Sequence, residues 1–267
     1  MSQNSRQTRG SGGRKVGALA SSALSMLASR QSVRQHGLSE RYLGALERAV
    51  RSPDTGARDA VVAEMLRAQI GRDDICDYYI PEVARRLGRA WCEDSVSFAD
   101  VTIGSARLQA LLRDIGGDHA AGLHQAPQGA NVAVMVLADE YHTLGAMVLT
   151  GQLRRLGVSV RLMLGRPLTE IEAVVRDSAF DAVLVSVAHR EELVSVRRAV
   201  TAIRAAGAAT LPVVIGGGIL ETGAEVCAET GANFATSDVR EALRLCGLVA
   251  EAGAEQMTGD RGQRPAP

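Results

Sequence analysis

The sequence of 267 residues lacks any long apolar run, although hydrophobic residues make up 46% of it. Because a membrane-spanning helix needs about 18 or more apolar residues in succession, no membrane contact is expected. The start of the chain lacks the charged, apolar and small-residue order of a secretory signal. The four cysteines, Cys76, Cys92, Cys227 and Cys246, have neither metal-ligand nor redox-pair spacing. These absences predict a cytoplasmic protein with reduced cysteines.

An excess of charge of one sign is also lacking, since 30 basic residues balance 30 acidic ones. Net charge therefore gives no support for nucleic acid as the main partner, and direct contact with DNA is left open. Residues 1–37 differ from the rest, because they are rich in Ser, Gly, Gln and Arg and precede the first acidic residue, Glu40. We expect a disordered basic tail there and a second disordered tail over residues 254–267.

Apolar residues recur with a period near 3.6 over residues 38–118, which is typical of amphipathic helices. The pairs Ser52-Pro53 and Ile80-Pro81 are expected to break this pattern and to divide it into about four helices. We predict a helical bundle over 38–118. A stretch rich in Gly, His, Gln and Pro then predicts a linker at 119–130.

The pattern of residues 131–253 changes to short apolar runs that alternate with amphipathic stretches, as in a parallel sheet flanked by helices. A capping box at Thr169 and Glu172 is expected to begin the helix after the second strand. The predicted fold is α + α/β, in which the helical bundle precedes a flavodoxin-like, doubly wound five-stranded sheet of strand order 2-1-3-4-5. The expected strands are 131–138, 158–164, 181–187, 211–215 and 233–236.

Polar or glycine-rich segments follow three of these strands. Residues 139–145 follow the first strand, Ser186 ends the third, and Gly216 and Gly217 follow the fourth. Strands 1, 3 and 4 are neighbours in the predicted order, so the three segments should line one crevice outside the carboxyl ends of the strands. Within it, His142 offers an imidazole that Glu140, two residues earlier, can orient.

Other common ligands of this fold do not suit these segments. A phosphoacceptor domain requires an aspartate at the end of the third strand and a lysine after the fifth, but Ser186 holds the first position and Lys15 is the only lysine. Dinucleotide binding requires G-x-G-x-x-G after the first strand, and a flavin phosphate requires a Ser/Thr/Gly-rich turn. The segment reads Glu-x-His-x-x-Gly instead.

This pattern resembles the cobalamin-binding signature D/E-x-H-x-x-G…S-x-L…GG in order and in spacing. The resemblance implies that cobalamin is the cofactor, that His142 is its cobalt ligand, and that Glu140 orients the imidazole. The other matching residues would line a tunnel for the nucleotide tail of the cofactor. Ala188 stands where the family has leucine. The matching residues are Glu140, His142, Gly145, Ser186, Gly216 and Gly217.

The helical half extends the resemblance. Trp91 and the stretch 98–109 resemble the helical caps that cover the upper face of the corrin in related families, which would make Trp91 a cofactor-binding residue. A tryptophan on an apolar helical face is equally consistent with a core residue. Light-sensing transcription factors of this type carry W-x9-E-H, but Val101 and Thr102 stand at the last two positions. This departure leaves the upper axial ligand and the photochemistry open.

Over residues 40–250 the chain resembles the AerR/PpaA family of photosynthesis-gene regulators. The resemblance implies a cobalamin-binding, light-responsive transcriptional regulator that is not an enzyme. It would act as an antirepressor by contact with a DNA-binding repressor of photosystem genes of the CrtJ/PpsR type. The alternative is a corrinoid carrier for a methyltransferase system, in which His142 tunes the cobalt while separate methyltransferases dock.

Overall fold

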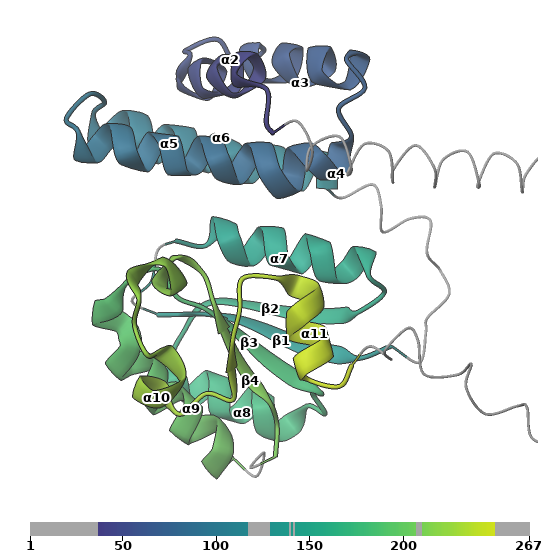
Figure 1. Cartoon of the computed structure of the whole chain (residues 1–267), viewed down its shortest axis with the longest axis vertical. Helices are drawn as coiled ribbons and strands as arrows, with labels where there is room; N and C mark the ends of the chain where they lie inside the picture. The colour runs from purple at the N-terminus through teal and green to yellow at the C-terminus, as the bar shows by residue number, and fades with distance from the viewer. Residues whose placement is uncertain (1–36, 117–128, 139, 141, 207–209, 249–267) are drawn as a thin grey trace, which may run out of the picture. The chain divides into compact units, whose positions relative to one another are not determined.

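The computed structural model describes residues 37–116, 129–138, 140, 142–206 and 210–248. The tails predicted at 1–37 and 254–267 and the linker predicted at 119–130 lie almost wholly outside these residues. The chain divides into two compact units, within residues 1–121 and 122–267. Figure 1 colours the helices of the first unit purple to blue and the sheet and helices of the second teal to yellow. Within the described residues, no helix is long and apolar enough to cross a membrane.

The first unit is helical, as its 3.6-residue period predicts. Its core contains Leu46, Met65, Leu87 and Leu108, none of which is exposed to solvent. The helices pack through these side chains, so the apolar stripe of each helix supplies the buried face. Its elements are α2 (Glu40–Arg51), α3 (Ala57–Arg67), α4 (Arg72–Asp74), the π-helical turn η1 (Ile75–Tyr79), α5 (Ile80–Cys92) and α6 (Phe98–Gly116).

The two proline-containing pairs behave differently. Helix α2 ends at Arg51, directly before Ser52-Pro53, as predicted. The break predicted at Ile80-Pro81 is wrong, because the chain stays helical from Arg72 through Cys92. Pro81 is the second residue of α5, and the helix continues past the backbone hydrogen bond that its missing N–H cannot make. The π-helical turn η1 shifts the backbone hydrogen bonds immediately before it.

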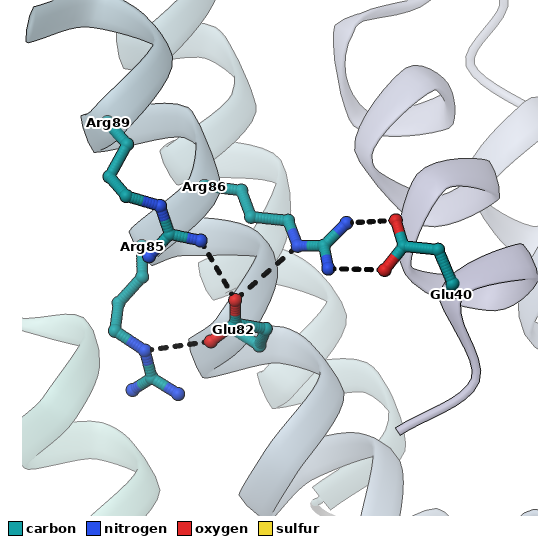
Figure 2. Close-up of polar contacts among 5 residues, drawn as sticks. All are labelled: Glu40, Glu82, Arg85, Arg86 and Arg89. Atoms are coloured by element: carbon teal, nitrogen blue, oxygen red, sulfur yellow. Dashed lines mark hydrogen bonds and ion pairs between the residues drawn. The ribbon is translucent and has the colours of Figure 1, made fainter. Parts of the chain in front are cut away.

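A cluster of ion pairs joins α5 to the start of α2 (Figure 2). Glu82 accepts hydrogen bonds from Arg85 and Arg89 at 3.0 Å each and from Arg86 at 3.4 Å. Arg86 also donates to both carboxylate oxygens of Glu40, at 2.5 and 2.6 Å. Because the arginine pair is bidentate, Arg86 links the first residue of α2 to α5, although the Glu40 side chain is 75% exposed and water weakens the pair.

The second unit contains a five-stranded parallel sheet of order β2-β1-β3-β4-β5, as predicted. The strands are β1 (Asn131–Leu137), β2 (Ser159–Arg166), β3 (Ala182–Ser186), β4 (Val213–Gly216) and β5 (Phe234–Ala235). The helical elements are α7 (Leu144–Arg155), α8 (Leu168–Asp177), η3 (Arg190–Glu192), α9 (Leu193–Ala205), η4 (Gly218–Thr222), α10 (Val226–Thr230) and α11 (Val239–Leu245).

Helices cover both faces of this sheet (Figure 1). One buried cluster joins alternate strand residues to α8, α9 and α10, and the other joins the remaining strand residues to α7 and α11. The central strands are buried on both faces, which explains why they read as continuous apolar runs instead of alternating patterns.

The predicted capping box is wrong. Helix α8 begins at Leu168, its N-cap is the extended residue Pro167, and no side chain caps it. Because β2 continues to Arg166, the turn into the helix comes earlier than the pattern suggests. Thr169 therefore lies inside the first turn, past the position at which its hydroxyl could cap.

Candidate functional site

Parallel pairing brings the ends of three strands together at one edge of the sheet. Ser186, the last residue of β3, is aligned with Gly216, the last residue of β4. On the other side of β3, strand β1 ends at Leu137 and turns at once, since the N–H of Glu140 donates to the Leu137 carbonyl at 3.2 Å. The segments that follow β1, β3 and β4 therefore meet, as the sequence predicts.

Glu140 and His142 form a carboxylate–imidazole pair at this edge. The side chain of Glu140 is only 3% exposed, whereas that of His142 is 64% exposed. One carboxylate oxygen, Oε1, lies 2.6 Å from the backbone N–H of His142 and 2.6 Å from its Nδ1. A carboxylate can only accept, so Nδ1 is the donor in this contact, and in the neutral imidazole Nε2 is then the nitrogen that can bind a ligand.

The second oxygen of Glu140 joins this pair to the next strand. Oε2 accepts a hydrogen bond from the backbone N–H of Ala188, just past β3, at 3.1 Å. Glu140 is thus a buried carboxylate with partners on both loops. Burial acts to raise its pKa, but hydrogen bonds with Glu192 and with the N–H and imidazole of His142 outweigh burial and lower the pKa.

Glu192 is a second carboxyl group beside Glu140. Burial, together with the hydrogen bond and the charge of Glu140, raises the pKa of Glu192 to about 7. Two adjacent carboxyl groups resist being ionised together, so the proton resides on Glu192 and Glu140 stays charged. The lowered pKa of Glu140 and the raised pKa of Glu192 both favour negative charge on the group that holds the imidazole.

His189 contacts His142 from the loop after β3. Their ring centroids lie 4.8 Å apart at an interplanar angle of 80°, an edge-to-face arrangement. Neither His189 nor Glu192 stands in the signature, although the sequence places His189 beside the predicted crevice; it gives no role to Glu192. Their shared signal is position: both lie within six residues of Ser186 on the loop that must border the crevice.

The glycines that follow β4 permit close backbone contacts. Gly217 has φ +101°, which L side chains rarely adopt, and a Cβ there would overlap the carbonyl oxygen of Val187. A Cβ on Gly216 would stand 3.0 Å from the Thr236 carbonyl oxygen. These two glycines therefore fit β4 against the loops that follow β3 and β5, in addition to any role beside a ligand.

Gly145, in the first turn of α7, lies beside the hydroxyl of Ser186 at the end of β3. A Cβ on Gly145 would meet only the hydroxyl oxygen of Ser186 within 4 Å, at an ordinary distance of 3.8 Å. The predicted site residues of this unit thus lie at one edge of the sheet, where an exposed imidazole, a glycine and a hydroxyl come together. These features fit a cofactor that brings a metal to His142 and inserts a tail beside Gly145.

Trp91 lies in the helical unit, at the end of α5. Its ring is paired with that of Phe98, with centroids 6.1 Å apart and planes at 57°. Trp91 is 48% exposed and Phe98 is 69% exposed, so the alternative that Trp91 is a core residue is wrong. Exposed paired aromatic rings are unusual on a monomer surface and favour a binding role.

Comparisons with known proteins agree with this geometry. The model of the B12 binding domain family matches residues 130–244. A Rhodobacter capsulatus protein, described as an uncharacterized 20.5 kDa protein in the bchF-crtJ intergenic region, is 34% identical over 191 residues, which is 72% of this chain and 100% of that protein.

One solved structure shares the fold. The Methanosarcina barkeri monomethylamine corrinoid protein is 13% identical with a TM-score of 0.62, over 78% of this chain and 98% of that one. A cobalamin-binding protein from Desulfitobacterium hafniense DCB-2 is 20% identical with a TM-score of 0.41, over 77% of this chain and 97% of that one. The predicted fold class and the predicted cofactor, cobalamin, are confirmed.

Proposed function

Because the chain belongs to the AerR-like family of cobalamin-binding proteins, we propose that it is a light-responsive transcriptional regulator that acts as an antirepressor. It would contact a DNA-binding repressor of photosystem genes of the CrtJ/PpsR type and would catalyse no reaction. The observation that carries this proposal is the full-length match to the R. capsulatus protein between bchF and crtJ. That relative is thus encoded in a photosynthesis gene cluster.

The residues of the α/β unit would hold the cofactor in two ways. Nε2 of His142 would ligate the cobalt, because Glu140 occupies Nδ1. The nucleotide tail would pass Gly145 and Ser186, where no bulky side chain stands on Gly145, and reach the backbone at Gly216 and Gly217. Bound cobalamin would supply a light-absorbing, redox-active cobalt centre. The protein itself contributes a fixed ligand and a carboxylate that stays charged.

The helical unit would report the state of the cofactor. A cofactor can shift a regulatory equilibrium only if it interacts differently with two states of an element that contacts it. The exposed pair of Trp91 and Phe98 is the apolar feature of the described helices best suited to such a contact. Trp91 would therefore contact the cofactor.

A corrinoid carrier is the second candidate, favoured by the fold shared with the monomethylamine corrinoid protein. In a carrier, His142 would tune the cobalt while methyltransferases dock in turn. The two functions share the cobalamin site and differ in their partners. Identity of 13% transfers a fold and not a partner, whereas 34% identity over the full length of a relative favours the regulator.

A binding assay on repressor and promoter DNA separates the two functions. The full-length protein, loaded with cobalamin, is added to a CrtJ/PpsR-type repressor bound to its promoter DNA, in the dark and after illumination. If the protein is an antirepressor, the repressor dissociates from the DNA in one light condition only. His142→Ala should then abolish this difference between dark and light. Unchanged DNA binding in both conditions, together with methyl transfer to the bound cobalamin by a partner methyltransferase, would establish the carrier instead.

A further inference from the structure

His189 lies beside the proposed cobalt ligand, although no part of the cobalamin signature includes it. Its ring meets that of His142 edge to face, with centroids 4.8 Å apart. Both residues are exposed, so burial in a common core does not force the rings together. The contact is a property of the two loops.

The backbone of His189 is held on both sides. The preceding residue, Ala188, donates its N–H to Glu140 at 3.1 Å, which is the same carboxylate that holds His142. The carbonyl of His189 accepts a hydrogen bond from the N–H of Glu192 at 3.3 Å, where the chain turns into η3. The imidazole of His189 therefore projects from an anchored segment.

The contact supplies a restraint that Glu140 alone does not give. Glu140 bonds to Nδ1 and to the backbone N–H of His142, but the imidazole remains 64% exposed. A hydrogen bond at one ring atom lets the ring tilt about that bond. The ring of His189, in contact with that of His142, opposes this tilt. A ligand whose direction is set before binding loses less conformational freedom on binding.

We propose that His189 is a positioning residue that fixes the ring plane of His142, so that Nε2 points in one direction before cobalamin binds. This inference rests on the assignment of His142 as the cobalt ligand. Edge-to-face aromatic pairs contribute enough to change an equilibrium constant by roughly 2- to 10-fold. A loss of cobalamin affinity of that size is expected when the ring is removed.

Three variants of the full-length protein test the proposal. His189→Ala removes the ring, His189→Phe keeps a ring without nitrogen, and His189→Gln keeps a polar group without a ring. Carbon relaxation of the His142 ring in the cofactor-free protein reports its restriction, and titration with hydroxocobalamin reports affinity. We expect the Ala and Gln variants to free the ring and to weaken binding roughly 2- to 10-fold, and the Phe variant to restore both.

Several results would overturn the proposal. His189→Ala with an unchanged ring restriction refutes it whatever the affinity, because a direct contact with the cofactor would then explain any weaker binding. Rescue by Gln and not by Phe refutes it as well, since a polar contact would then be responsible. His142→Ala in the same series tests the ligand assignment separately from the role of His189. An unaltered spectrum of the bound cobalamin would show that His142 is not the cobalt ligand.

Discussion

One oxygen of Glu140 serves two groups of His142: Oε1 lies 2.6 Å from the backbone N–H and 2.6 Å from the ring Nδ1. The backbone contact fixes where the residue stands, and the ring contact fixes which nitrogen is free. The other oxygen binds the loop after β3. A single buried carboxylate thus couples His142, after the end of β1, to the backbone that follows β3.

The charge of Glu140 should matter more than its shape. Glu140→Gln keeps an acceptor for the imidazole of His142. It removes the negative charge that would make this imidazole a stronger cobalt ligand. Outer partners of metal ligands typically contribute about 10- to 100-fold to metal affinity, and we expect cobalamin affinity to fall by that order. Equilibrium titration with hydroxocobalamin measures it. Unchanged affinity in a folded variant would show that Glu140 acts only on the loops.

The raised pKa of Glu192 predicts a pH dependence of folding in the cofactor-free protein. The ordinary pKa is 4.5 and the folded value is about 7, so the folded state binds this proton more tightly. The stabilisation from Glu192 is complete below about pH 4.5 and is lost as pH rises through about 7. Glu192→Gln cannot ionise. The free energy of unfolding of this variant, relative to that of the native protein, should therefore increase from about pH 5 to pH 8.

Urea unfolding across this range provides the measurement, with Glu191→Gln as the control. Glu191 is an exposed neighbour on the same turn. Its replacement should leave the pH dependence of the native protein unaltered. If Glu192→Gln and the native protein show parallel curves, the two carboxyl groups do not share a proton in the way described.

Gly145 tests the passage for the nucleotide tail. Gly145→Leu should fold normally, because the only atom near a Cβ there is the Ser186 hydroxyl oxygen at 3.8 Å. Its side chain would fill the space beside Ser186 and should weaken cobalamin binding. Gly151→Leu on the same helix, where a Cβ meets only the flexible end of Arg155, is the matched control. Equal affinities in the two variants would place the tail elsewhere.

Gly217 is expected to be structural as well as ligand-lining. Gly217→Ala combines a strained φ of +101° with overlap of the Val187 carbonyl, whereas Gly223 has φ +70° with nothing within 4 Å. Strain of this kind costs about 1–3 kcal/mol, and the overlap adds to it. Thermal unfolding should therefore show a larger loss for Gly217→Ala than for Gly223→Ala. The opposite order would mean that the loop yields freely around Val187.

The strands were predictable because buried parallel strands leave apolar runs, and their order followed from the doubly wound topology that alternating strands and helices indicate. The continuous helix through Pro81 was not predictable from the sequence. A π-helical turn depends on tertiary packing and has no characteristic spacing of apolar residues. The site divides in the same way. His142 and Glu140 stand two residues apart in a motif, but Glu192 acts on Glu140 from 52 positions away in sequence. Only the pairing of β1 with β3 brings these two carboxyl groups together.

The absorption spectrum of cobalamin bound to the native protein and to His142→Ala tests the central claim most directly. The imidazole of His142 is exposed, so its removal should leave the fold intact, as circular dichroism can verify. With His142 as the cobalt ligand, the native spectrum differs from that of free cobalamin at the same pH, and the variant binds more weakly with a shifted spectrum. A variant that binds with the native affinity and the native spectrum would contradict the assignment.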